Sequence, residues 1–189
     1  MSPNRYLGIT LTAAVAALAA CSVVALAATT ADIDSRATTA LNRFEAQSDT
    51  HRDLIQKASA ILVFPRITKA GAGVGGEFGE GALQVAGHSA GNYKVTGGSI
   101  GATLGVARYS EVILFMTDAA RDHFMSSHDW SIGADANVAI VKKGVGGDYD
   151  TETLRKPVLA FVFNEKGLLG DVSLQGAKIS QLPATAESQ

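Results

Sequence analysis

The chain has 189 residues, of which 47% are hydrophobic and 18% are charged, and its formal net charge is −2. This composition excludes a disordered chain, and it gives no global electrostatic reason to bind nucleic acid. Any contact with an anionic surface must therefore come from a local patch of basic residues. The length is that of one domain with a core of its own, once a targeting segment is removed.

The first twenty residues have the features of a lipoprotein signal peptide. Arg5 supplies the positive charge, and a short apolar run leads to Leu18-Ala19-Ala20-Cys21, which matches a lipobox. Small residues there fit the peptidase, and only a thiol can carry the diacylglyceryl group. Because several acyl chains anchor a protein stably, we expect acylated Cys21 to hold the protein on a membrane. Cys21 is the single cysteine, so no internal disulfide can form.

Two other interpretations of this segment stay open. Cleavage after Ala25-Leu26-Ala27 would give an ordinary secreted protein, and residues 6–28 are long enough to remain as a membrane-spanning helix. In the lipoprotein interpretation, Ser22 follows the acylated cysteine in place of the aspartate that usually retains a lipoprotein in the inner membrane. We therefore expect an exported protein that faces the periplasm from the outer membrane.

The mature chain is expected to hold one domain. Residues 1–20 would be the signal peptide and 21–31 a tether, followed by a single domain over 32–182 and a frayed tail over 183–189. Apolar residues at helical spacing predict a helix over 32–47, and Asp49 or Thr50 would cap a second helix that ends near residue 60. The buried faces of these helices would consist of Ile33, Ala37, Leu41 and Phe44, and of Leu54, Ile55 and Ala58.

A β pattern follows. Residues 60–65 predict a short strand that ends at Pro65, and between residues 71 and 105 glycines repeatedly recur two residues apart. On a strand this spacing places glycines on one face, where they allow close backbone approach or a sharply coiled sheet. The pattern predicts an α+β fold, in which N-terminal helices pack on a glycine-rich, strongly curved antiparallel sheet or partial β-barrel.

The second half of the chain continues this alternation. Residues 99–108 and 131–141 alternate as strands, and residues 111–117 are apolar on both faces, which indicates a central strand. A short helix is expected to begin at Thr117-Asp118, between strands. Residues 157–163 and 168–179 predict a final hairpin with its turn at 164–167.

No motif in the sequence indicates an enzyme, a metal site or a cofactor site. Gly71-Ala72-Gly73-Val74-Gly75-Gly76 has the dinucleotide-binding spacing, but the residues after it favour a strand and not the helix that would hold a pyrophosphate. His123 and His128 lack the spacing of a zinc pair. Asp135, Asn137 and Ser131 share one face of a predicted strand, and this face is either solvated or the lining of a polar cavity.

The basic residues Lys57, Arg66 and Lys69 fall within thirteen positions. They form either an ordinary solvated face or a local patch that meets lipid headgroups.

Several ordered motifs resemble the SYLF domain family over about residues 37–182. They are residues 57–65, Lys69-Ala70-Gly71 with residues 73–76, Gly79-Glu80-Gly81, residues 97–101, residues 133–136 and residues 167–176. The resemblance implies a lipid-binding module, and it places basic lipid contacts on Lys57, Arg66 and Lys69. Eukaryotic members are associated with phosphoinositides and actin, and bacterial members include exported lipoproteins.

Two departures from the family limit what is carried over. The family's Gly-Leu-Gln-x-Gly segment reads Gly101-Ala102-Thr103-Leu104-Gly105, and the Trp-Ser-x-Pro stretch of many eukaryotic members is absent near residues 92–95. An exported bacterial protein meets no actin in its own cell, so actin binding is not carried over.

The sequence thus predicts a membrane-anchored envelope lipoprotein, not an enzyme, whose domain binds anionic phospholipid headgroups. The alternative is a structural or interaction lipoprotein with no lipid site beyond its anchor. An enzyme would require that Asp135 or His128 meet a second titratable group in a pocket.

Overall fold

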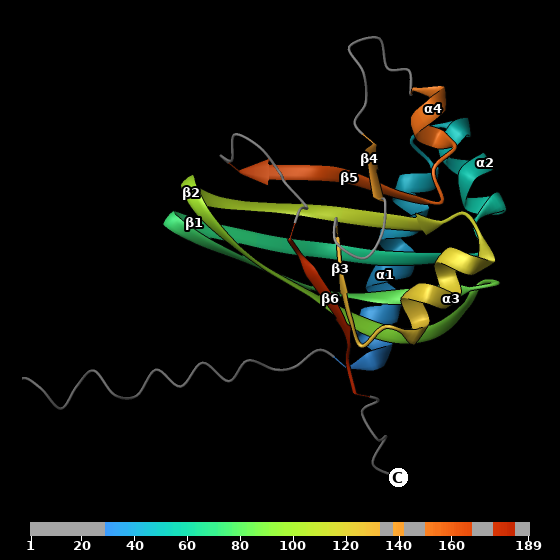
Figure 1. Ribbon diagram of the computed structural model, residues 1–189, viewed down its shortest axis with the longest axis horizontal. Coiled ribbons are helices and arrows are strands. Elements are labelled where there is room, and N and C mark those ends of the chain that lie inside the picture. Colours follow the sequence, from blue (N-terminus) through green and yellow to red (C-terminus); the bar gives the residue numbers. More distant parts are fainter. Residues whose placement is uncertain (1–28, 133–137, 142–149, 168–175, 184–189) are drawn as a thin grey trace, which may run out of the picture.

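One long antiparallel hairpin, β1 (Ala60–Val85) with β2 (His88–Phe115), is the framework of the fold (Figure 1). The computed structural model describes residues 29–132, 138–141, 150–167 and 176–183. Pairing runs from Ala60 opposite Phe115 to Val85 opposite His88, and the hairpin bends back on itself near its middle. The strand predicted at 60–65 is therefore the first part of β1, and the strands predicted at 99–108 and 111–117 run together in β2.

The sheet has six strands in the order β3-β6-β2-β5-β4, with β1 paired to β2. The remaining strands are β3 (Asp129–Ser131), β4 (Val138–Val141), β5 (Val158–Gly167) and β6 (Lys178–Gln181). Counted by passes, with β1 and β2 each crossing twice, the sheet is a strongly curled eight-stranded half-barrel. It is mixed because β4 runs parallel to β5, whereas the sequence predicts antiparallel pairing only.

The four helices begin at clear capping residues. They are α1 (Thr30–Glu45), α2 (Asp49–Lys57), α3 (Asp118–Ser126) and α4 (Thr151–Leu154). Both predicted N-terminal helices and the short helix after Thr117 are confirmed. The cap of α2 is Ser48, whose hydroxyl accepts the His51 amide at 3.2 Å, and not the predicted Asp49 or Thr50. No helix in the described part of the chain has the length and apolar character needed to cross a membrane.

Two hydrophobic cores lie on opposite faces of the sheet. Ile113 and Phe115 face the interior of the curl, where they join Trp130 and Phe124, whereas Val112 and Leu114 face α1 and α2. This confirms a central strand that is buried on both faces over residues 111–115, whereas the predicted range to residue 117 runs past the end of β2 into the Thr117 cap of α3. Both cores and all the described elements lie between residues 29 and 183.

The glycines predicted to share one face allow the hairpin to curl. A Cβ atom on Gly79 would lie 2.9 Å from the Arg66 carbonyl oxygen, and one on Gly81 would overlap the Val63 carbonyl oxygen. The second half of β1 therefore packs directly on the backbone of its first half. Larger residues at positions 79 and 81 would force the two halves apart.

Two sequence predictions about strand ends are wrong. Pro65 does not end a strand, because β1 passes it through a bulge opposite Ser110, whose hydroxyl donates to the Pro65 carbonyl at 2.9 Å. The predicted turn at 164–167 belongs to β5, with Asn164 in the left-handed region at φ 56°. Among the described residues β5 and β6 do not pair with each other, since they flank β2 on opposite sides.

Substitution of Gly81 tests the close approach. Gly81→Ala is expected to lower the free energy of unfolding by about 3 kcal/mol, because the new methyl group has no space beside Val63. Gly98→Ala is the matched control, since a Cβ there meets nothing within 4 Å, and it should change stability by less than about 1 kcal/mol. Urea denaturation of both variants checks this, and equal stabilities would contradict the role given to Gly81.

Candidate membrane-contact site

The bend of the hairpin exposes an uncharged strip on its outer face. Along β1 exposure alternates, so that Ala70, Ala72, Val74, Gly76 and Phe78 face solvent while Gly71, Gly75 and Glu77 are less exposed. Val74 is 70% exposed and Phe78 is 52% exposed. Val106 lies opposite Ala70 on β2 and is also 52% exposed. We call these six residues the outer strip.

A row of basic residues borders the outer strip. Arg108 pairs with Thr68 on one side and Lys166 on the other, so these three side chains share the outer face. Arg66 lies at the bulge two residues before Thr68 and is exposed, as are Arg108 and Lys166. Within the described residues none of these three basic side chains forms an ion pair. Arg66, Arg108 and Lys166 are the basic row.

Polar side chains inside the curl hold the bend together. Lys69 and Glu77 face each other from the two arms of the bend, with Lys69 Nζ 3.8 Å from Glu77 Oε2 and both side chains less than 10% exposed. The Tyr109 hydroxyl donates to the same Glu77 oxygen at 2.9 Å. Gly97 lies opposite Glu77, and a Cβ there would lie 2.5 Å from the Glu77 carboxylate. These contacts join residues eight apart on β1 and fix the shape of the outer strip.

Glu111 is a buried carboxyl group in the same interior. It is fully buried, and neither of its carboxylate oxygens has a hydrogen-bond partner among the described residues. Burial, followed by the charge of Glu77, raises the pKa of Glu111 to about 8. Burial and the charges of Glu77 and Glu111 also raise the pKa of Tyr109, so Tyr109 stays a hydrogen-bond donor. Glu111 is therefore largely protonated at neutral pH.

The structure separates the three predicted headgroup residues. Arg66 is exposed in the basic row, whereas Lys57 is exposed at the end of α2, near the start of β1 and away from the bend. Lys69 lies inside the curl and pairs with Glu77, so in this conformation it has no access to a headgroup. The predicted acylation residue, Cys21, lies outside the described residues.

The other polar candidates do not converge on a site. His51 is buried, and its Nδ1 lies 2.9 Å from the Phe44 carbonyl oxygen while its ring stacks on the Phe44 ring. His123 and His128 are exposed, and Asp135 and Asn137 lie outside the described residues. In the described part of the chain no group of three or more His, Cys, Asp or Glu side chains is placed to hold a metal ion. Residues 71–76 lie within β1, with strand on both sides.

A known family model matches part of the chain. Residues 96–187 match the family model Ysc84, described as "Las17-binding protein actin regulator". This confirms the resemblance drawn from the motifs, with the Ysc84 (SYLF) domain family matched over residues 96–187. That family is associated with lipid binding and is generally non-catalytic. A comparison with curated proteins gave no match.

Sequence reasoning missed Arg108, Lys166 and the outer strip. The available signal was the alternation from Lys69 to Phe78, in which every second residue from Ala70 on is small or apolar and the other positions carry Lys69, glycines and Glu77. That alternation indicates only that the two faces of this strand differ in polarity. The pairing that brings Arg108 beside Lys166 joins residues 58 positions apart, and no local pattern predicts it.

The pH dependence of stability tests the buried state of Glu111. The pKa of Glu111 is raised in the folded chain. Its contribution to the free energy of unfolding is therefore most favourable below the ordinary pKa of 4.5, and this contribution is lost as pH rises through about 8. Glu111→Gln removes this loss, so its stability advantage over the unmodified protein should grow by roughly 3 kcal/mol between pH 4.5 and 8.

Urea denaturation across that pH range measures the difference. Glu165→Gln makes the same chemical change at an exposed position of β5, and its pH dependence should follow that of the unmodified protein. A parallel dependence for Glu111→Gln would show that Glu111 is ionised or solvated in the folded protein.

Proposed function

We propose that the protein is an exported, membrane-anchored lipoprotein whose SYLF domain binds anionic phospholipid headgroups and performs no catalysis. The observation that carries the proposal is the basic row, in which three exposed cations lie on adjacent strands and form no ion pair with any described residue. The family matched by residues 96–187 is associated with lipid binding. Phosphate groups in headgroups are the anions that such a row would meet at a membrane surface.

The anchor and the domain would act together. Acylation of Cys21 would keep the domain beside a bilayer, in the periplasm and on the outer membrane, so headgroup binding becomes effectively intramolecular. Each exposed cation near an anionic surface contributes about 1 kcal/mol of binding free energy. Three of them therefore give weak binding from solution, which is enough to hold the domain on a membrane to which it is already anchored. Arg66 stays in this site from the sequence prediction, and Arg108 and Lys166 replace Lys57 and Lys69.

The alternative is an interaction lipoprotein of the envelope with no lipid site beyond its anchor. In that case the basic row would have no preference for lipid, and residues 29–189, which lack the anchor, would not bind vesicles. The two functions therefore differ in one measurable property, the affinity of the unanchored domain for anionic bilayers.

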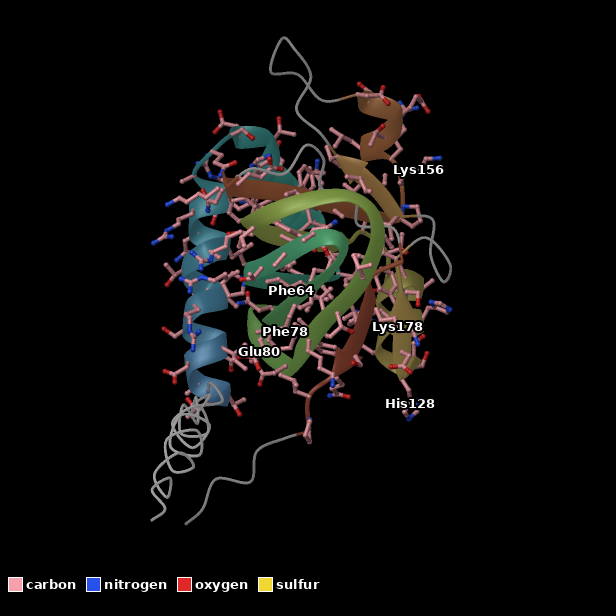
Figure 2. The ribbon with its side chains drawn as sticks, turned by 90° about the vertical axis from the view of Figure 1, so that its left-hand side faces the viewer. Phe64, Phe78, Glu80, His128, Lys156 and Lys178 are labelled. Carbon is pink, nitrogen blue, oxygen red and sulfur yellow. The ribbon has the colours of Figure 1, made fainter. Side chains whose placement is uncertain are left out.

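Vesicle co-sedimentation of residues 29–189 tests the proposal. Binding should rise with the fraction of phosphatidylglycerol in phosphatidylcholine vesicles and weaken with salt, because exposed charges are screened. The affinity of the double variant Arg108→Ala/Lys166→Ala for these vesicles should be lower by at least about tenfold. The control Lys57→Ala/Lys156→Ala removes the same charge from two exposed positions away from the bend and should bind normally (Figure 2 labels Lys156).

Absence of binding at every lipid composition would leave the interaction lipoprotein as the function. Equal losses in the two double variants would show that net charge, and not the basic row, governs binding.

A further inference from the structure

We infer that the outer strip enters the bilayer interface, with Val74 deepest and with Phe78 and the basic row at the level of the phosphates. The inference rests on the proposed lipid binding and adds how the domain sits on the membrane. It assigns the apolar residues of the bend a binding role that headgroup contact alone does not require.

The composition of the outer strip is the first reason. From Ala70 to Phe78 no outward position of β1 carries a charge, and each of these side chains or glycines is exposed. The next outward residue is Glu80, which lies opposite Lys94. Val74 and Phe78 are among the most exposed large apolar residues of the described chain. Exposed apolar surface of this kind marks an interaction site.

Elsewhere on the same face of the sheet, helices cover the apolar residues. Away from the bend, Val63, Ala82 and Val112 lie on this outer face and are covered by α1 and α2. No described element covers the outer strip. Figure 2 looks directly at the bend, with α1 along one side and Phe78 on the curled strands in the centre.

The position of the basic row favours a bilayer over a protein partner. Val106 and Arg108 are two residues apart on the same face of β2, about 7 Å along the strand. Apolar residues thus lie directly beside cations that form no ion pair within the described part of the chain, in the order that the acyl region and the anionic headgroups have in a membrane. The bend is also the end of the molecule that projects away from α2 (Figure 1), so it can enter a surface without a collision with the helices.

The interior contacts favour insertion at low entropic cost. Lys69 and Glu77 are paired within the bend, and Tyr109 donates to Glu77. A bend that is already fixed loses little conformational freedom when it enters the interface, so more of the apolar burial appears as affinity.

Site-specific labelling tests the inference. Residues 29–189 contain no cysteine, so Val74→Cys can carry a single environment-sensitive fluorophore. On phosphatidylglycerol-rich vesicles its emission should shift to shorter wavelength, and spin labels on the acyl chains should quench it. Met125→Cys is the control, because Met125 is exposed at 46% on α3, and its label should stay in water.

An affinity measurement accompanies the labels. Phe78→Asp should weaken co-sedimentation with the same vesicles about tenfold, whereas Met125→Asp should leave it unchanged. Both positions are exposed, and urea denaturation of each variant confirms that the fold is retained.

The outcomes separate the two proposals. If the protein binds vesicles while the label at position 74 stays in water, the inference is overturned and headgroup binding stands. If residues 29–189 bind no vesicles at all, both the insertion and the proposed headgroup binding are contradicted. A shift of the position-74 label that depends on protein concentration without vesicles would show that the outer strip pairs with a second copy, and this too would overturn insertion.

Discussion

The structure depends on the direct backbone contact between the two halves of β1. Gly79 and Gly81 lack the Cβ atoms that would strike the backbone near Arg66 and Val63, so the hairpin can close on itself. This closure creates an interior for one hydrophobic core and leaves the outer face for the second core under α1 and α2. It also turns the middle of the hairpin into an exposed bend, and the candidate site lies there.

The interior of the bend holds one carboxyl group whose contacts stabilise the fold and one whose burial lowers the stability of the folded state. Glu77 accepts from Tyr109 and pairs with Lys69, which ties the two arms of the bend together. Glu111 lies in the same interior without a hydrogen-bond partner among the described residues, and its raised pKa reflects the cost of a buried charge. Gly97 leaves the space that the Glu77 carboxylate fills. The shape of the bend thus follows from contacts that only the curled hairpin makes possible.

Local patterns predicted the helices, the central strand at 111–117 and the common face of the glycines, because helix and strand periodicity express burial directly. They did not predict that β1 continues past Pro65, since a bulge depends on the partner strand. They also placed Lys69 in a surface patch, although the curl turns its side chain inward to Glu77. The basic row joins three strands, and its composition follows from register, which a single sequence does not encode locally.

The central claim is that the bend is the membrane-contacting surface, and hydroxyl-radical footprinting of residues 29–189 tests it most directly. Phe78 on the bend and Met125 on α3 are exposed to a similar extent, at 52% and 46%, and both side chains can be oxidised. With anionic vesicles, oxidation of Phe78 should fall severalfold while oxidation of Met125 stays the same. Protection of Met125 with Phe78 unchanged would place the contact elsewhere on the molecule and contradict this account.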